Sequence, residues 1–241
     1  MIKASLTLCL AALAALPALA DSVPQPDVKA QDSWTYAETN QLNGRWSQKR
    51  TEYTVERASR AGILLAIKEV GSTQAANEQM VNPDWSRVRS VNGKETVVNR
   101  PFAFPLEPNK SWDVDYTEDH PNRAHKSEHF HSPYTVVGWE DVTVPAGTFK
   151  ALKIEADGNW TAEIEPATIN ANLSRNDSQG TTQIQQSNTG RPTTATGRTY
   201  KAFWYVPAIK RWVKFDEEYY GNNGGLTERH AGELESYKVG E

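Results

Sequence analysis

Hydrophobic and polar side chains alternate with a period of two along most of the chain beyond residue 33. Trp112, Val114 and Tyr116 alternate with polar residues, and Leu152 and Ile154 do the same. Such alternation indicates antiparallel strands with one buried and one solvated face. The pattern predicts strands over residues 33–40, 46–57, 62–70, 84–91, 94–99, 110–118, 127–144, 148–165, 198–207, 211–220 and 226–238.

Turn-forming dipeptides separate many of these segments, at Asn43–Gly44, Asn92–Gly93, Asp157–Gly158 and Asn223–Gly224. Both residue types tolerate a positive φ, which tight hairpins require. Pro145 and Gly147 predict a turn that joins 134–144 to 148–156 as one hairpin. Only Thr73 to Met80 favours a short helix. We therefore expect a single all-β domain over 32–241, with little helix and a strongly curved antiparallel sheet that forms a half-barrel or open barrel.

The first twenty residues have the three parts of a secretory signal peptide. Lys3 gives a positive start, an apolar stretch follows, and Ala18 and Ala20 are small residues suited to cleavage before Asp21. The apolar stretch is shorter than the roughly 20 residues that a membrane span needs. The sequence thus predicts a periplasmic or secreted protein without a transmembrane segment after cleavage. Residues 21–31 are expected to form a flexible leader.

Cleavage changes the chemistry of the mature chain. Cys9 is the only cysteine and lies within the signal peptide, so its loss excludes disulfides, thiolate metal sites and cysteine nucleophiles. Loss of Lys3 takes the formal charge from −4 to −5. A net negative charge disfavours nucleic acid and anionic lipid surfaces as partners.

Residues 167–199 differ from the rest because they are rich in Asn, Ser, Thr, Gln and Gly. We expect this polar insert to be a long surface loop or a solvent-exposed hairpin. The alternative is a mobile flap over a binding cavity. Strong strand signals resume at Tyr200, so the insert does not mark a domain boundary.

Three segments carry a resemblance to a known family. They are DSWTY at 32–36, VVGWEDVTVPAGTFKALKI at 136–154, and FWYVP at 203–207 followed by RWVK at 211–214. In order and spacing they resemble the TapB-like group of exported bacterial proteins, most of which have no assigned function, across roughly residues 30–240. The resemblance implies a curved antiparallel β fold related in outline to periplasmic lipoprotein carriers. It implies no catalytic residues.

Four of the five histidines lie within twelve residues, at His120, His125, His129 and His131. On a strand, His129 and His131 share one face, and Asp119 or Glu128 lies near enough in sequence to complete a site. Imidazole ligands suit zinc or copper. The alternative interpretation is a polar, solvent-facing hairpin end without metal.

A carboxylate run at Asp216, Glu217 and Glu218 raises a second catalytic hypothesis. On a strand, Asp216 and Glu218 share a face, and paired carboxylates carry out glycoside hydrolysis. The alternative is a solvated strand face opposite Phe215. The sequence contains no G-x-S-x-G nucleophile elbow.

Eight tryptophans in one domain give the strongest sign of binding. Most of them are expected in the core, but tryptophan also lines apolar cavities and stacks on sugars. Trp204, Tyr205 and Trp212 are the ligand-binding candidates. The leading hypothesis is a non-enzymatic envelope protein that binds a lipid-like, glycan or peptide ligand. The alternatives are a metal-dependent or carboxylate-based hydrolase, and an interaction protein that meets an envelope partner through a strand edge or the polar insert.

Overall fold

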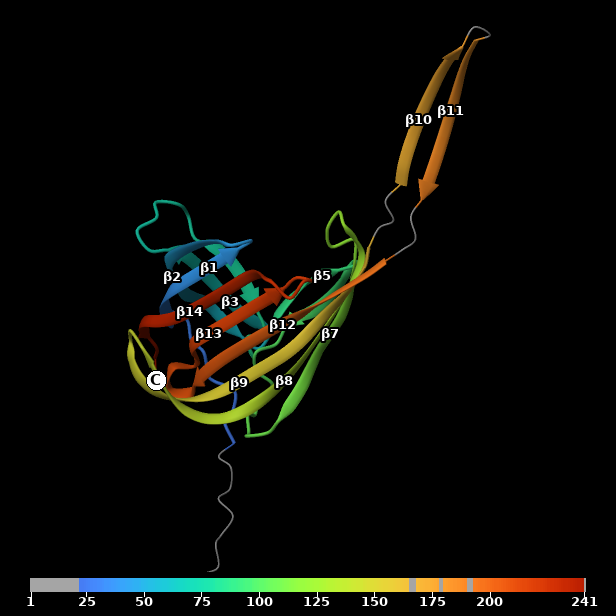
Figure 1. The fold of residues 1–241 in the computed structure, drawn as a ribbon. Coiled ribbons are helices and arrows are strands. Elements are labelled where there is room, and N and C mark those ends of the chain that lie inside the picture. Colours follow the sequence, from blue (N-terminus) through green and yellow to red (C-terminus); the bar gives the residue numbers. More distant parts are fainter. Residues whose placement is uncertain (1–21, 165–167, 178–179, 190–192, 241) are drawn as a thin grey trace, which may run out of the picture.

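A computed structural model describes residues 22–164, 168–177, 180–189 and 193–240, which form β-structure almost throughout (Figure 1). The predicted signal peptide, Met1–Ala20, lies outside these residues. The strands are β1 (Ser33–Leu42), β2 (Arg45–Ser59), β3 (Gly62–Glu69), β4 (Asn77–Val81), β5 (Arg87–Val91), β6 (Lys94–Asn99), β7 (Ser111–Asp119), β8 (His125–Val144), β9 (Gly147–Ile164), β10 (Thr168–Asp177), β11 (Gly180–Thr189), β12 (Thr193–Val206), β13 (Arg211–Tyr220) and β14 (Leu226–Lys238). One 3₁₀ turn, η1 (Pro207–Ile209), joins β12 to β13.

Ten strands form one antiparallel sheet in the order β4-β3-β2-β1-β14-β13-β12-β9-β8-β7. Most neighbours are joined by hairpins, and two long-range pairings complete the sheet. β1 pairs with β14, which brings the two ends of the domain together, and β9 pairs with β12. The sheet is open, with β4 and β7 as its edges. The expected all-β antiparallel class is confirmed, and within the described ranges the chain contains no α-helix.

Most of the predicted turns are confirmed. Asn43 and Asn92 have φ values of 48° and 52° and are followed by glycines with positive φ, as a tight hairpin requires. β8 ends at Val144 and β9 begins at Gly147, so the central hairpin turns where Pro145 predicts. The Asp157–Gly158 prediction is wrong, because this dipeptide lies inside β9. Glycine is needed there since a Cβ on Gly158 would lie 2.4 Å from a backbone oxygen of β8.

The segment predicted as a helix, Thr73 to Met80, overlaps the edge strand β4 instead, which extends one residue further to Val81. β4 pairs with β3 in a register that joins Val81 to Ile63, and both side chains are buried. Hydrogen bonds to a neighbouring strand and burial of Val81 outweigh the weak local preference for helix.

The polar insert contributes three pieces of strand. β10 and β11 pair with each other as a separate two-stranded sheet, which stands apart from the main sheet in Figure 1. β12 begins at Thr193, earlier than the residue 198 predicted, and pairs with β9 from Thr193↔Ile164 to Tyr205↔Leu152. β10 and β11 thus form a hairpin between β9 and β12, which is one of the two alternatives expected for the insert.

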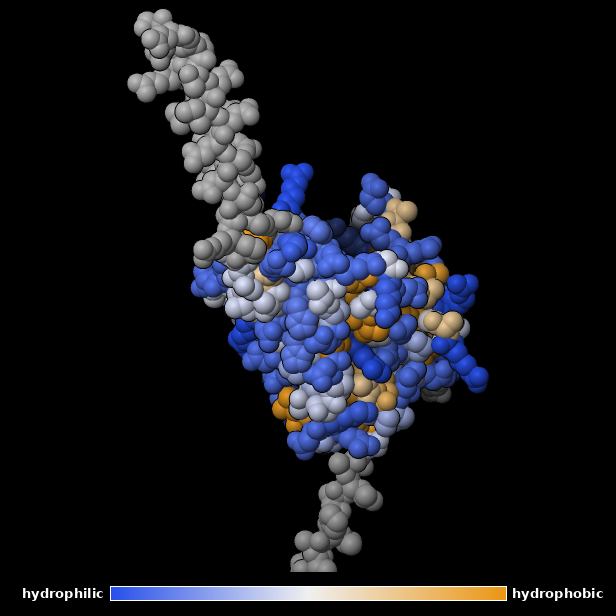
Figure 2. Space-filling view, turned by 90° about the vertical axis from the view of Figure 1, so that its right-hand side faces the viewer, coloured by the Kyte–Doolittle hydropathy of each residue, from blue (hydrophilic) through white to orange (hydrophobic). Residues whose placement is uncertain are grey.

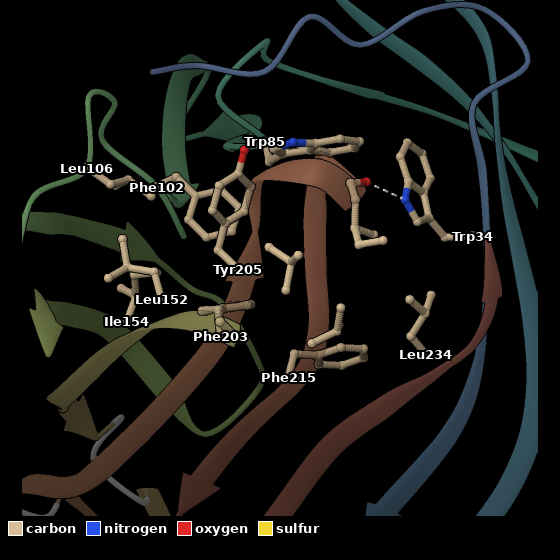
Figure 3. Packing of buried hydrophobic residues seen from close by; sticks show 14 of the residues in the cluster. Trp34, Trp85, Phe102, Leu106, Leu152, Ile154, Phe203, Tyr205, Phe215 and Leu234 are labelled. Atoms are coloured by element: carbon tan, nitrogen blue, oxygen red, sulfur yellow. Dashed lines mark hydrogen bonds between the residues drawn. The ribbon is translucent and has the colours of Figure 1, made fainter. Parts of the chain in front are cut away.

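The hydrophobic core lies against one face of the main sheet, which we call the inner face (Figure 3). Phe102 and Leu106, from the segment between β6 and β7, are fully buried over this face. The Phe102 ring lies 4.7 Å from the ring of Tyr205 and 5.8 Å from that of Trp212, centroid to centroid. Within residues 21–31, expected as a flexible leader, Val23 forms a β-bridge with Leu106, and both Val23 and Val28 are buried.

Candidate ligand-binding cavity

Two adjoining hollows lie on the inner side of the sheet. The first has a volume of about 90 Å³ and an aromatic wall, and the second has a volume of about 230 Å³ and a more polar wall. Arg87, Glu217 and His230 line both hollows. We call the pair the inner cavity. The aromatic wall of the first hollow consists of Tyr53, Trp85, Phe203, Trp212 and Phe215.

Arg211, the first residue of β13, lines the first hollow inside a cage of aromatic rings. Arg211 is only 4% exposed. Its guanidinium carbon lies 4.3–5.4 Å from five ring centroids, within the range of cation–π attraction. This aromatic cage consists of Trp34, Tyr36, Tyr53, Trp85 and Trp212.

Three rings of the cage also fix the backbone on either side of Arg211. The indole of Trp34 donates to the carbonyl of Ile209 at 2.9 Å, and that of Trp85 donates to the carbonyl of Lys210 at 3.1 Å. The Tyr36 hydroxyl donates to the carbonyl of Trp212 at 2.6 Å. Rings from β1 and from the β4–β5 connection therefore hold the η1–β13 junction in place.

Several buried donors at this junction have no hydrogen-bond partner among the described residues. They are Nε and Nη1 of Arg211, Nε1 of Trp212 and the hydroxyl of Tyr205. An unpaired buried polar group costs about 1–3 kcal/mol and calls for a structural or functional explanation. The concentration of four such atoms within eight residues distinguishes this junction from the rest of the described chain.

A partly buried charge network lies in the wall that the two hollows share. The amide of Asn99 donates to Glu217 at 2.7 Å, and Lys201 and Arg87 lie 3.7 and 3.8 Å from the same carboxylate oxygen. Burial alone would raise the pKa of Glu217, but the two cations outweigh it and hold this pKa below its usual value. Burial lowers the pKa of Lys201, and Glu217 offsets part of that effect. Glu217 is therefore an ion-paired carboxylate.

A buried carboxylate, Glu38, contacts the aromatic cage through Tyr53. It accepts hydrogen bonds from Tyr53 at 2.5 Å and Thr51 at 2.8 Å, and His230 Nε2 lies 3.6 Å away. Burial opposes ionisation, but the contacts with His230, Tyr53 and Thr51 prevail and lower the pKa of Glu38 to about 2. Lys49 adds a cation at 3.6 Å. Glu38 is thus fully engaged with its own neighbours.

The three predicted ligand-binding residues are placed differently from one another. Trp212 lines the first hollow. Tyr205 is fully buried in the core beside it. Trp204 contacts a different set of side chains, because its indole donates to Glu140 and Lys153 lies 5.3 Å from its ring centroid. A bulge in the β12–β13 pairing sets Tyr205 opposite Trp212, so these two side chains share the inner side.

The four histidines do not converge. His125 bonds to Glu128 at 2.7 Å and stacks on Trp160, whereas His129 and His131 pair with Asp115 and Asp113 of β7. His120 lies in the turn between β7 and β8. Strand alternation puts the buried Glu128 on one face of β8 and His129 on the other. Among the described residues, no group of three or more His, Cys, Asp or Glu side chains is arranged to hold a metal ion.

The carboxylates of the hydrolase hypothesis are bound to cations. Arg229 donates to both oxygens of Asp216, at 2.8 and 2.5 Å, and its Nε lies 3.5 Å from Glu218. Glu218 also accepts a hydrogen bond from Tyr220 at 2.6 Å. Asp216 and Glu218 therefore share one guanidinium, so neither carboxylate has the separate setting that an acid–nucleophile pair needs.

Sequence reasoning missed Arg211, Glu38 and His230, which come from β13, β1 and β14. An arginine beside a tryptophan at the start of a strand is the only local sign of the cage. The contacts that make Arg211 unusual come from residues more than 100 positions away, such as Trp34 and Trp85.

On the face of the molecule in Figure 2, hydrophobic residues appear in small groups among hydrophilic ones. A larger open groove of about 630 Å³ lies between residues 25–28, 58–60 and 82–84. None of the unpaired buried donors lies in its wall, which makes the inner cavity the stronger candidate. No helix within the described ranges is long and apolar enough to cross a bilayer.

No family model and no curated protein matches the chain. Among solved structures, a protein from Parabacteroides distasonis described as a lipoprotein is 14% identical, with a TM-score of 0.45, covering 90% of this chain and all of that one. An exported protein with a YmcC-like fold from Bacteroides fragilis is 16% identical, with a TM-score of 0.35 and the same coverage. The lipoprotein YmcC from Escherichia coli is 12% identical, with a TM-score of 0.31 and 84% of each chain covered.

Proposed function

We propose that this chain is an exported, non-enzymatic binding protein that holds one small molecule in the inner cavity. One observation carries the proposal: a hollow persists among tightly packed aromatic rings, and its wall contains buried donors without partners. Concave, largely apolar sites with a few polar groups are typical of small-molecule binding. In this proposal the sheet curves around the ligand as a half-barrel.

Of the three ligand classes predicted, the cavity favours a short lipid-like molecule over a glycan or a peptide. Together the two hollows reach the lower end of the roughly 300–1,000 Å³ found for small-molecule sites. Trp85, Phe203 and Phe215 offer an apolar wall to a hydrocarbon body. A peptide strand would instead need backbone pairing at a sheet edge.

Export and family membership belong to the same proposal. The signal peptide pattern of Met1–Ala20 supports a periplasmic or secreted location. Membership of the TapB-like group is supported by the three quoted segments, which include the start of β1, the β8–β9 hairpin and the β12–β13 junction.

A non-enzymatic role is supported by the state of the carboxylates. Glu217, Asp216 and Glu218 each lie within ion-pair distance of a cation, and the pKa of Glu217 lies below its usual value. A general acid or base at neutral pH requires a pKa moved toward 7, which is the opposite direction.

The test is mass spectrometry of organic extracts from the exported protein, purified without detergent. Gln79 lines the first hollow, whereas the next residue of β4, Met80, is exposed and absent from its wall. We expect a small amphiphile in the wild-type extract, its loss from Gln79→Trp, which fills the hollow, and its retention in Met80→Trp. An extract without ligand, or equal retention by both variants, would refute the proposal.

A further inference from the structure

We propose that the ligand carries a carboxylate, which binds in the first hollow to donors from Arg211 and Trp212. This inference rests on the proposed function and names the chemical group that the cavity recognises. It follows from a buried positive charge without a counterion at the wall of a cavity.

Arg211 lacks the partner that a buried cation normally has. No carboxylate of the described residues lies within ion-pair distance of it, and two of its nitrogens are buried without a hydrogen bond. The aromatic cage attracts the guanidinium but accepts no conventional hydrogen bond in the plane of that group. A buried charge of this kind is costly unless it is both paired and hydrogen-bonded.

Other shielded cations in the described chain have such a partner. Lys210, the residue before Arg211, lies 3.1 Å from the buried Asp32. Lys201 lies 3.7 Å from Glu217. The fold therefore places carboxylates beside neighbouring cations but not beside Arg211. In this proposal, a ligand bound in the cavity that Arg211 lines supplies the missing anion.

Two carboxylates could have served Arg211: Glu217, which lines the first hollow, and Glu38, which bonds to Tyr53 in the wall of that hollow, and both are already engaged. Glu217 is bound by Asn99, Arg87 and Lys201. Glu38 bonds to the Tyr53 hydroxyl and to Thr51, while Arg211 lies over the Tyr53 ring, 4.3 Å from its centroid. Neither carboxylate is within ion-pair distance of Arg211.

Trp212 supplies a second, independent indication. Its indole Nε1 is also buried without a partner, and its side chain lines the same hollow as Arg211. A charged donor beside a neutral donor matches an acceptor group with one negative charge. A volume of about 90 Å³ suits a carboxylate and the first carbons of its chain, and the adjoining hollow of about 230 Å³ has room for the rest of the ligand.

A carboxylate fits this pair of residues better than a phosphate. A phosphate monoester carries up to two negative charges and three acceptor oxygens at pH 7. The first hollow offers one uncompensated charge, because Arg87 is paired with Glu217 and His230 lies beside Glu38. One charge and few donors match a carboxylate.

The test compares three probes that share an eight-carbon alkyl chain: octanoate, octanol and octyl phosphate. Their binding is measured by calorimetry at pH 7 on protein from which bound ligand has been removed. We expect octanoate to bind wild type at least tenfold more tightly than either of the other two. Trp212→Phe keeps the ring and the charge but removes the donor, so octanoate should weaken severalfold and octanol should not change. Arg211→Met should abolish the preference for octanoate. Arg45→Met, at the exposed β1–β2 turn, is the matched control.

The outcomes separate this inference from the proposed function. Equal binding of octanoate and octanol to wild type overturns the carboxylate but leaves the binding function standing, and tighter binding of octyl phosphate does the same. If Arg211→Met fails to fold, Trp212→Phe decides, and an unchanged octanoate affinity overturns the inference. Failure of all three probes, together with an empty extract, overturns both proposals.

Discussion

Trp34 and Ile209 are 175 residues apart in sequence and are joined by a buried hydrogen bond of 2.9 Å from the indole nitrogen to the backbone carbonyl. The bond ties β1, at the start of the domain, to the η1 turn that precedes Arg211. Trp34 is also one of the rings around the guanidinium, so one side chain contributes both an aromatic face and a donor to the cage.

Trp34→Phe is expected to lower the free energy of unfolding by at least about 1–3 kcal/mol, because it leaves a buried carbonyl unpaired. Urea denaturation followed by circular dichroism measures the change. Trp46→Phe provides the control, since Trp46 is 68% exposed and should tolerate the same replacement. Equal effects of the two substitutions would contradict the importance of the Trp34–Ile209 bond.

Tyr205→Phe is expected to leave stability unchanged or to raise it in the ligand-free protein. The Tyr205 hydroxyl is buried without a partner, so its removal relieves an unsatisfied group without losing the ring contacts. Thermal unfolding is the appropriate measurement. Tyr134→Phe is the contrasting variant, because the Tyr134 hydroxyl donates to Asn99 at 3.0 Å and its loss should destabilise. A clear destabilisation by Tyr205→Phe would show that its hydroxyl has a partner in solution.

Glu38 should make the protein sensitive to acid. Its pKa is lowered from 4.5 to about 2 in the folded chain, so its contribution to stability is complete above pH 4.5 and is lost as the pH falls toward 2. The difference corresponds to roughly 3 kcal/mol. We expect the loss of unfolding free energy between pH 7 and pH 2 to be smaller in Glu38→Gln than in wild type. The control is Glu56→Gln at an exposed position of β2, which should keep the wild-type pH dependence.

Gly232→Ala is expected to destabilise the protein by about 1–3 kcal/mol through overpacking. A Cβ at this position would lie 2.4 Å from Cε1 of Phe215, whose ring is already in contact with those of Trp212 and His230. Because Phe215 lines the first hollow, octanol binding should weaken as well. Gly240→Ala is the control, since its nearest atom would lie at an ordinary 3.8 Å. Unaltered stability of Gly232→Ala would show that the Phe215 ring moves freely.

Zinc or copper is expected to leave the melting temperature unchanged, because His125 and His129 belong to different clusters. A metal at 100 times its dissociation constant would add about 2.7 kcal/mol to the stability, which differential scanning calorimetry detects readily. An increase that disappears in His129→Asn would revive the metal hypothesis for this strand.

The strands were largely predictable because burial on one face of a sheet leaves a local trace, a period of two, in the sequence. All eleven predicted segments contain a strand. β4 was missed because it is a short edge strand in which only Val81 is buried. For β10 and β11 the sequence left a loop and a hairpin as alternatives, because their composition is polar and two strands that pair only with each other need no alternating apolar face.

The inner cavity was less predictable, because its main feature is that buried donors of Arg211 and Trp212 have no hydrogen-bond partners. The aromatic content pointed to Trp212, which lines the first hollow, but also to Trp204, which contacts Glu140 instead. A bulge between β12 and β13 brings Trp212 opposite the buried Tyr205, and alternation alone cannot locate a bulge. That Arg211 lacks a carboxylate becomes visible only when every neighbouring strand is in place.

The pairing of β9 with β12 also gives the molecule a modular junction. Ile164 and Thr193 are direct partners across this ladder, so the chain leaves and re-enters the main sheet at adjacent points. A two-residue Asn-Gly turn can therefore replace residues 165–192 without changing the register on either side. The same junction offers a place to insert a reporter domain without altering the residues that line the inner cavity.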